Sequence, residues 1–218
     1  MDPEFWHQRW AQQQIGFHQQ DINPYLVEHW QRLSLSPGAR VLVPCCGKSS
    51  DMLWLCGQGF TVIGLEISRL AVEAFFNDNA LKALVQDHGR FSSWETNELQ
   101  ILCGDLFDLS RQDIGEIDAV YDRAALIAMP PTMRQAYVDQ LRHLTGKPVR
   151  QLLVTMEYNQ AEMDGPPFSV GESEVHVRYA DVYQVQMLER RVVGDPPSRF
   201  TEKGLSGLSE AAYYLQPR

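Results

Sequence analysis

The sequence has no long apolar run and no leader of the secretory type. No stretch of its 218 residues approaches the roughly 20 consecutive apolar residues that a membrane-spanning helix needs. The segment Met1–Trp10 has neither the basic start nor the apolar centre of a secretory signal peptide. We therefore expect a cytoplasmic protein that does not enter a membrane.

Cysteines are few, and their spacing is not that of a metal or redox site. The four cysteines form no CxxC pair of the kind that begins a zinc site or a disulfide-exchange motif: Cys45, Cys46, Cys56 and Cys103. We therefore expect no bound metal. Cys56 and Cys103 lie within apolar runs, which predicts that they are small buried residues without a reactive role.

Basic residues are too few for a surface that binds nucleic acid. The chain has 19 Lys and Arg against 28 Asp and Glu, and the formal net charge is -9. Such a charge repels a phosphate backbone, and the basic residues form no local stripe that would overcome this repulsion. The expected partner is a small molecule, and the length suits a single domain.

The chain does contain short apolar runs that alternate with helical patterns, in the order typical of an α/β sheet. Five runs rich in β-branched and aromatic residues predict buried parallel strands at Arg40–Val43, Phe60–Leu65, Gln100–Cys103, Ile117–Tyr121 and Val149–Glu157. Helices are predicted to begin after Asn23, at Ser68 and at Pro131. Two further runs, Val182–Leu188 and Ala211–Leu215, flank the turn sequence at 194–197 and predict an antiparallel pair that closes the sheet edge. The predicted fold is a doubly wound, mostly parallel sheet.

Two polar stretches interrupt this pattern. Residues 84–98 precede the third strand, and the sequence assigns them neither an element nor a role. Asn159–Pro167 is too long for a minimal connection and predicts a loop that covers a site.

The first predicted strand ends in a turn with a single glycine, Pro44-Cys45-Cys46-Gly47-Lys48-Ser49-Ser50-Asp51. This turn is neither the GxGxxG loop that holds a dinucleotide pyrophosphate nor the GxxxxGK[ST] loop that holds nucleotide phosphates. A single glycine that allows close approach suits a nucleoside that carries an amino-acid tail in place of phosphates, because this tail can contact the backbone directly. An ordinary strand-to-helix turn explains the turn equally well.

Candidate ligand-binding side chains follow the second and third strands, at the sheet edge where such folds bind ligands. Glu66 lies about 20 residues beyond the glycine turn, where a carboxylate accepts hydrogen bonds from both hydroxyls of a ribose. The alternative is a solvated Glu near the start of the helix at Ser68. After the third strand, Asp105 and Leu106 are placed to hold an adenine ring, and Asp108 is expected to be a turn or capping residue.

Arg123 follows the fourth strand, where an unpaired buried guanidinium is costly. We expect it to face a cleft and to bind a carboxylate of a cofactor or of an acidic substrate, with Asp122 or a neighbouring carboxylate setting its angle. The alternative is a purely structural ion pair between Asp122 and Arg123.

Several motifs resemble, in order and across most of the chain, those of the thiopurine S-methyltransferase family, whose bacterial members are associated with tellurite and selenium methylation. They are Trp6-His7-Gln8-Arg9-Trp10, Gly16-Phe17-His18, Pro44-Cys45-Cys46-Gly47-Lys48, Val62-Ile63-Gly64-Leu65-Glu66-Ile67-Ser68, Phe107-Asp108-Leu109, Asp122-Arg123-Ala124-Ala125-Leu126 and Gly165-Pro166-Pro167-Phe168. The resemblance implies a class I S-adenosylmethionine-dependent methyltransferase fold. It also implies that S-adenosylmethionine contacts Trp10, Cys45, Glu66, Leu106 and Arg123, and that Phe17 lies near both cofactor and acceptor. Position 45 is commonly Leu in the family, which indicates that bulk or a backbone contact matters there.

The implied activity is methyl transfer, by a monomer, to the sulfur of thiopurine-like heterocyclic or aromatic thiols, and to selenium or tellurium species. A thiol that ionises near neutral pH is already nucleophilic, and a sulfonium carries its own leaving group, so we assign no catalytic base. Two other functions remain open at this point. A nicotinamide-dependent oxidoreductase is disfavoured by the missing GxGxxG motif, and a non-catalytic α/β module that binds a metabolite is harder to exclude.

The N-terminal segment, residues 1–22, precedes the Rossmann-like core at 23–218. Trp6 and Trp10 are four residues apart and share one helical face. This spacing predicts an amphipathic turn that docks on the open cofactor cleft as a lid. The alternative is packing of both tryptophans in the core.

Overall fold

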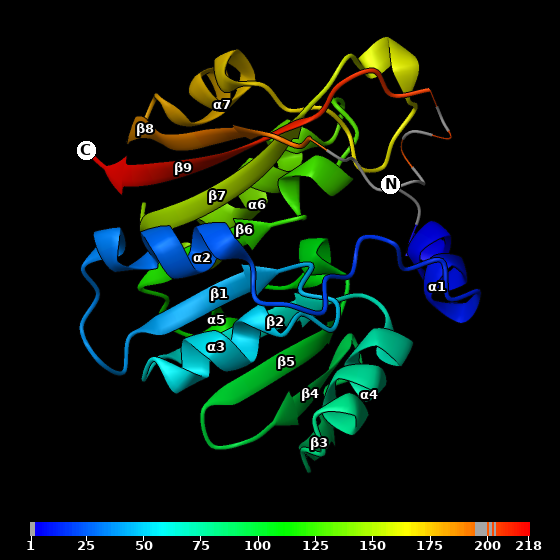
Figure 1. Ribbon diagram of the computed structural model, residues 1–218. Coiled ribbons are helices and arrows are strands. Elements are labelled where there is room, and N and C mark those ends of the chain that lie inside the picture. The colour runs from blue at the N-terminus through cyan, green and yellow to red at the C-terminus, as the bar shows by residue number, and fades with distance from the viewer. Residues whose placement is uncertain (1–2, 195–199, 201, 203) are drawn as a thin grey trace.

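The computed structural model describes residues 3–194, 200, 202 and 204–218, which are built around one mixed sheet (Figure 1). Within these residues the sheet has nine strands in the order β3-β4-β5-β2-β1-β6-β7-β9-β8. The strands are β1 (Arg40–Pro44), β2 (Thr61–Glu66), β3 (Leu84–Asp87), β4 (Phe91–Glu95), β5 (Leu99–Gly104), β6 (Ala119–Arg123), β7 (Arg150–Glu157), β8 (Tyr183–Val192) and β9 (Ser209–Pro217). The predicted doubly wound α/β fold is confirmed.

The middle of the sheet is parallel, and both of its ends are antiparallel. β1 pairs in parallel with β2 and β6, β2 with β5, and β6 with β7. β9 runs antiparallel between β7 and β8, as the runs at 182–188 and 211–215 predict. The chain moves from β1 outward to β2 and later returns to the other side of β1 with β6. The carboxyl ends of β1 and β6 therefore border a switch point, where open α/β sheets bind their ligands.

Helices cover both faces of the sheet, because alternate side chains of each strand point to opposite faces. Val41 and Val43 pack in the apolar cluster of one face, whereas Leu42 packs in that of the other. The first face carries α2 (Pro24–His29), η1 (Trp30–Leu33), α3 (Asp51–Gly57) and α4 (Arg69–Asp78) (Figure 1). The second face carries α5 (Arg111–Ile114), α6 (Arg134–Thr145) and α7 (Glu172–Tyr179).

The predicted helix starts are correct to within a few residues. The side chain of Asn23 caps α2 by accepting a hydrogen bond from the Tyr25 N–H at 3.1 Å, and α4 begins directly after Ser68. The helix expected from Pro131 begins at Arg134, because a turn closed by the Met133 N–H and the Pro130 carbonyl oxygen precedes it.

Residues 84–98, which the sequence left without an element, contain a hairpin that extends the sheet. β3 and β4 pair antiparallel, and β4 pairs with β5. Phe91 and Trp94 of β4 are buried against the core, whereas all four residues of β3 are exposed. A strand without a buried face has no period-2 pattern for sequence reasoning to detect.

The prediction that Cys56 and Cys103 are buried is wrong, since both are only half-buried. Cys56 lies in the last turn of α3 and Cys103 near the end of β5, where neighbouring elements cover a side chain less completely than at the middle of an element. Residues 195–197 of the predicted turn between β8 and β9 lie outside the described residues.

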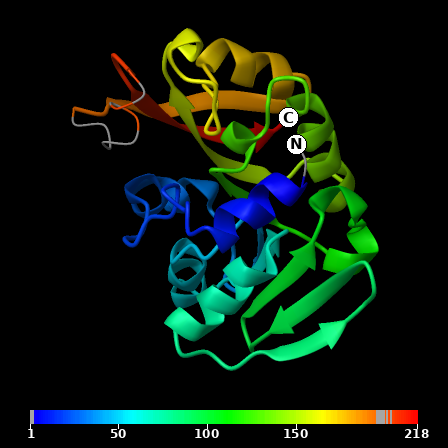
Figure 2. The ribbon, with the colours of Figure 1, turned by 90° about the vertical axis from the view of Figure 1, so that its right-hand side faces the viewer.

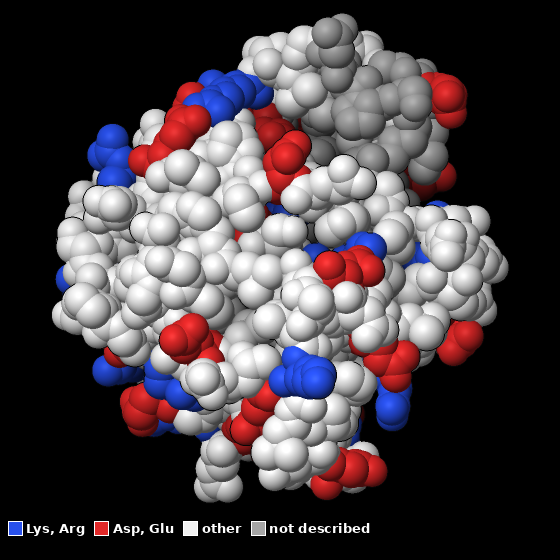
Figure 3. Space-filling view, turned by 60° about the horizontal axis from the view of Figure 1, so that its bottom comes forward, with Lys and Arg blue, Asp and Glu red and all other residues white. Residues whose placement is uncertain are grey.

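The described residues include no helix that is both long enough and apolar enough to cross a membrane. On the face shown in Figure 3, Lys and Arg side chains are interspersed with Asp and Glu side chains. Among the residues coloured by charge on this face, the positive side chains are therefore divided into small groups and form no continuous stripe.

Candidate functional site

A cavity of about 690 Å³ opens at the carboxyl ends of the parallel strands. Its wall includes residues from the ends of β1, β2, β5, β6 and β7, the edge at which the switch point lies. Every residue predicted to contact cofactor or acceptor lines this one cavity: Trp10, Phe17, Cys45, Glu66, Leu106 and Arg123.

The turn after β1 forms the floor of the cavity and contains two residues with left-handed backbone. Their φ angles are +48° for Cys45 and +53° for Gly47. Glycine adopts this conformation without penalty, whereas cysteine does so at a cost that is typical of ligand-binding turns. Burial raises the pKa of the Cys45 thiol well above its ordinary value, which favours the neutral thiol.

Glu66 ends β2 and is only 6% exposed, so it is not the solvated residue that the alternative interpretation required. Its Oε2 accepts a hydrogen bond from the Gly47 N–H and its Oε1 accepts one from the Ser68 N–H, each at 2.8 Å. Burial raises the pKa of Glu66, and the two N–H groups oppose that rise. Each carboxylate oxygen keeps further acceptor capacity, which suits a ligand with two adjacent hydroxyls.

The turn after β5 presents an apolar side chain to the cavity. It forms the short helix η2 (Leu106–Asp108), in which Leu106 is buried. Asp105 is the capping residue, since its side chain accepts a hydrogen bond from the Phe107 N–H at 2.9 Å, and Asp108 ends the turn. An apolar surface beside polar groups is suited to a flat heterocycle.

Arg123 ends β6 and is held by Asp51, the first residue of α3. Its Nε and Nη2 each donate to Asp51 Oδ2 at 3.3 Å, and Nη2 also donates to Ser49 Oγ at 3.3 Å. Tyr121 donates its hydroxyl to the same Asp51 oxygen at 3.0 Å, and the Asn23 N–H donates to Asp51 Oδ1 at 2.8 Å. The Nη1 of Arg123 has no hydrogen-bond partner among the described residues, which leaves its N–H groups available to a ligand carboxylate.

Asp122 does not pair with Arg123, so both the structural ion pair and the orienting role considered for Asp122 are wrong. Neighbouring residues of a strand point to opposite faces, and Asp122 therefore faces α6. There it accepts hydrogen bonds from the Tyr137 hydroxyl at 2.7 Å and from the Leu126 N–H at 3.1 Å. Burial raises the pKa of Asp122 to about 6, against the lowering effect of these donors.

The N-terminal helix α1 (Pro3–Ala11) lies beyond the strand ends, in front of the sheet edge in Figure 2. The rings of Trp6 and Trp10 meet Phe17 edge to face, with centroids 5.7 and 5.6 Å apart. A Cβ atom at Gly47 would lie 3.3 Å from the Trp10 ring, so the indole rests on the glycine turn. Within the described residues, neither tryptophan belongs to the apolar clusters of the sheet.

The rest of the cavity wall comes from the part of the chain after Arg123, and we call this part of the wall the acceptor half. Its side chains are mostly apolar, and three of them are methionines. The apolar residues include Ile127, Met129, Met133, Met156, Pro166, Pro167, Phe200 and Leu208. Pro166 and Pro167 belong to the loop that was expected to cover a site. Among the residues that the structure describes, Glu210 is the charged member of the acceptor half.

Sequence reasoning gave no role to two carboxylates of this site. Asp51 is the last residue of the glycine turn and the first residue of α3, and a carboxylate at this position is a signal that could have identified it as a partner for Arg123. Glu210 lies on the antiparallel strand β9, and the rule that ligands bind at the carboxyl ends of parallel strands does not point to it.

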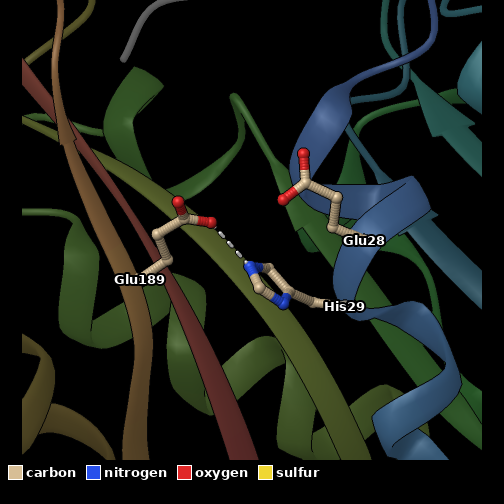
Figure 4. A group of neighbouring side chains, drawn as sticks. All are labelled: Glu28, His29 and Glu189. Carbon is tan, nitrogen blue, oxygen red and sulfur yellow. Dashed lines mark hydrogen bonds and ion pairs between the residues drawn. The ribbon is translucent and has the colours of Figure 1, made fainter.

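A separate group of Glu28, His29 and Glu189 lies outside the residues that line this cavity (Figure 4). His29 Nε2 and Glu189 Oε2 are 3.0 Å apart. Arg191 forms ion pairs with both Glu28 and Glu189. The guanidinium therefore balances the two carboxylates, and the group is an ion-pair network between α2 and β8.

Several solved structures with the same architecture are methyltransferases. An S-adenosylmethionine-dependent methyltransferase from Anabaena variabilis matches with a TM-score of 0.64 at 14% identity, covering 99% of this chain and 95% of that one. The 1,6-didemethyltoxoflavin-N1-methyltransferase of Burkholderia thailandensis, solved with S-adenosylhomocysteine, matches with a TM-score of 0.62 at 14% identity, covering 98% and 87%. The fold is that of the class I S-adenosylmethionine-dependent methyltransferases.

The family is given by closer relatives. A family model described as thiopurine S-methyltransferase matches residues 1–218. A thiopurine S-methyltransferase of Pseudomonas entomophila is 50% identical over 215 residues, 99% of each chain. One from Nitrosospira multiformis is 44% identical over 218 residues, 100% of this chain and 99% of the relative. The chain belongs to the thiopurine S-methyltransferase family, as its motifs indicate.

The protein is therefore a methyltransferase with S-adenosylmethionine as its cofactor. The hypotheses of a nicotinamide-dependent oxidoreductase and of a non-catalytic binding module are not retained. The cavity fits this cofactor in three respects. It has the volume of a small-molecule site, a buried carboxylate at the tip of β2 and, at the tip of β6, guanidinium N–H groups that have no partner within the described part of the chain.

Proposed function

We propose that this enzyme transfers the methyl group to the sulfur of heterocyclic or aromatic thiols, and also to selenium or tellurium species. The apolar, thioether-containing wall of the acceptor half carries this proposal. For the thiol acceptors, such a wall favours flat, polarizable and weakly hydrated molecules over sugars or alcohols, because it offers few hydrogen-bond partners to a polar molecule. The name of the relatives, thiopurine S-methyltransferase, supports the same acceptor class.

We assign roles to the residues around the cofactor as follows. Glu66 accepts hydrogen bonds from the ribose hydroxyls, and Arg123 binds the carboxylate of the methionine tail through Nη1. Leu106 packs on the adenine ring, and Cys45 supports the tail by its bulk. Trp10 stabilises the positive sulfonium through its ring face, as in other cation–π contacts.

The chain supplies alignment and exclusion of water more than acid–base chemistry. The bound cofactor provides an activated methyl group and its own leaving group. Phe17 and the acceptor half position a thiolate in line with that group, and holding two reactants in place accelerates such a transfer by several orders of magnitude. A thiol that is ionised before it binds requires no base from the protein.

We further propose that residues 1–22 form a lid over the core at 23–218. The contacts of Trp10 with Gly47 and Phe17 support this role, since Trp10 belongs to α1 and rests on the glycine turn. Closing such a segment expels water from the reacting groups. The cytoplasmic location and the monomeric state remain predictions from the sequence.

The test is a product assay with labelled S-adenosylmethionine and a panel of acceptors. The panel contains a thiopurine, thiophenol, selenite, tellurite and a catechol as an oxygen acceptor. We expect methylated product from the thiopurine and thiophenol, with turnover on the catechol at least 100-fold lower. Label transfer to the catechol alone, or to none of the panel, would contradict the proposal.

A further inference from the structure

Glu210 places a carboxylate in the acceptor half of the cavity. β9 runs antiparallel to β7, so the first residues of β9 lie beside the carboxyl end of β7, where Glu210 is paired with Met156. In the sheet order, β9 lies beyond β6 and β7 as seen from β1. The side chain therefore lines the cavity on the side away from the glycine turn and Glu66.

The carboxylate of Glu210 has no hydrogen-bond or ion-pair partner among the described residues, although the residue is only partly exposed. Arg191, its neighbour on β8, is instead paired with Glu28 and Glu189. Burial raises the pKa of Glu210, and the charges of Arg123 and Arg191 oppose that rise. A half-buried carboxylate without a partner is costly, and a ligand that donates a hydrogen bond to it removes the cost.

The chemistry of such a ligand is constrained by the carboxylate of Glu210, which lines the cavity. A carboxylate only accepts hydrogen bonds, so the acceptor molecule must present an N–H or O–H donor to Glu210. Heterocyclic thiols with a ring nitrogen next to the C–S carbon exist largely as thiones, in which that nitrogen carries the proton and the sulfur is neutral. A neutral thione is a weaker nucleophile than a thiolate.

We infer that Glu210 binds the ring N–H of heterocyclic thione acceptors and takes up its proton during methyl transfer; this inference rests on the proposed function. The acceptor sulfur forms a bond to the methyl carbon while the bond between the methyl carbon and the cofactor sulfur breaks. The electron pair of the broken bond stays on the cofactor sulfur. The proton passes from the ring nitrogen to Glu210, the C=S bond becomes a C–S single bond, and the ring gains a C=N bond. Solvent then receives the proton from Glu210.

This role separates two classes of acceptor. Thiophenols carry no ring N–H and react as thiolates formed in solution, so they gain little from a carboxylate at this place. Heterocyclic thiones gain both an orienting hydrogen bond and a proton acceptor, which makes Glu210 a determinant of preference for heterocycles.

The test compares Glu210→Gln, Glu210→Asp and the parent protein on pyridine-2-thione and on thiophenol. We expect the ratio of kcat/KM for the thione to kcat/KM for thiophenol to fall at least tenfold in Glu210→Gln. Glu210→Asp should recover part of that ratio, because it keeps the proton acceptor. Glu98→Gln is the matched control, since Glu98 is an exposed residue outside the cavity lining. Calorimetry with S-adenosylhomocysteine and a melting curve verify that each variant is folded and binds cofactor.

The outcomes distinguish this inference from the function on which it rests. An unchanged ratio in a folded Glu210→Gln variant, or an equal loss on both acceptors, would overturn the role of Glu210 and leave thiol methylation intact. A parent protein that methylates neither acceptor would overturn both.

Discussion

Replacing Glu66 by glutamine or alanine separates the two tasks of its carboxylate. Its two oxygens accept hydrogen bonds from the Gly47 and Ser68 N–H groups, each at 2.8 Å. A glutamine has one acceptor oxygen, so its NH₂ group must face one of these donors. A buried donor without a partner costs about 1–3 kcal/mol. For a chain of this size, a loss of about 2 kcal/mol lowers Tm by roughly 4–8 °C.

The second task is the binding of the ribose hydroxyls. A hydrogen bond to a charged group contributes about 1.5–3 kcal/mol, so we expect Glu66→Gln to weaken cofactor binding by about 2 kcal/mol, or roughly 30-fold in Kd. Glu66→Ala removes both acceptors and should weaken binding by at least as much. The assay is calorimetric titration with S-adenosylhomocysteine at a temperature well below the Tm of each variant, with Glu98→Gln as the control.

Melting curves without ligand report the first task, and the titration reports the second. A lower Tm together with parental Kd values in both variants would show that Glu66 only holds the glycine turn. That result would refute the ribose assignment.

Three further predictions concern other parts of the molecule. A chain that begins at Asp21 should stay folded but lose most cofactor affinity and nearly all turnover, and a truncated chain with full affinity and turnover would refute the lid. In the full chain, Trp10 fluorescence should change when cofactor is added. Because burial raises the pKa of Asp122 to about 6, the folded state favours the protonated form, and the parent loses stability from this group as pH rises from about 4 to above 6. Asp122→Asn removes that loss, so chemical denaturation should show the variant to be more stable than the parent by about 1–3 kcal/mol at pH 8 and equally stable near pH 4. A difference in unfolding free energy that does not change with pH would contradict the assignment. Dialysis against EDTA should leave turnover intact, and activity that is lost and then restored by zinc or magnesium would show a metal requirement.

The residues at the ends of the parallel strands were predictable from the sequence for a geometric reason. Strands of this kind, linked by helices, bring all their carboxyl ends to one edge. A turn with one glycine, a carboxylate and an arginine after successive apolar runs therefore had to meet there, and Gly47, Glu66 and Arg123 line one cavity.

Adjacency in the sequence was misleading where the alternation of strand side chains decides the contact. Asp122 and Arg123 are neighbours in the chain but point to opposite faces, so the partner of Arg123 is Asp51, 72 positions away. The position of that carboxylate depends on how α3 leaves the glycine turn, and no local pattern encodes this direction.

The remaining gaps come from antiparallel strands. β3 has no buried face, so hydrophobic patterning gives no sign of it. Glu210 stands near the start of its strand, and only the reversed direction of β9 brings it to the edge where the parallel strands end. Strand direction is a property of the whole topology, which patterns of a few residues do not reveal.

The segment that carries Trp10 continues directly into Phe17 and His18, and all three residues line the same cavity. Trp10 rests on the glycine turn, whereas its ring partner Phe17 is predicted to lie near the acceptor. If cofactor binding orders this segment, it raises the affinity for the acceptor by some factor. The acceptor must then raise the affinity for the cofactor by the same factor, because the two binding equilibria form a thermodynamic cycle. The affinity of either ligand measured alone then understates its affinity in the ternary complex.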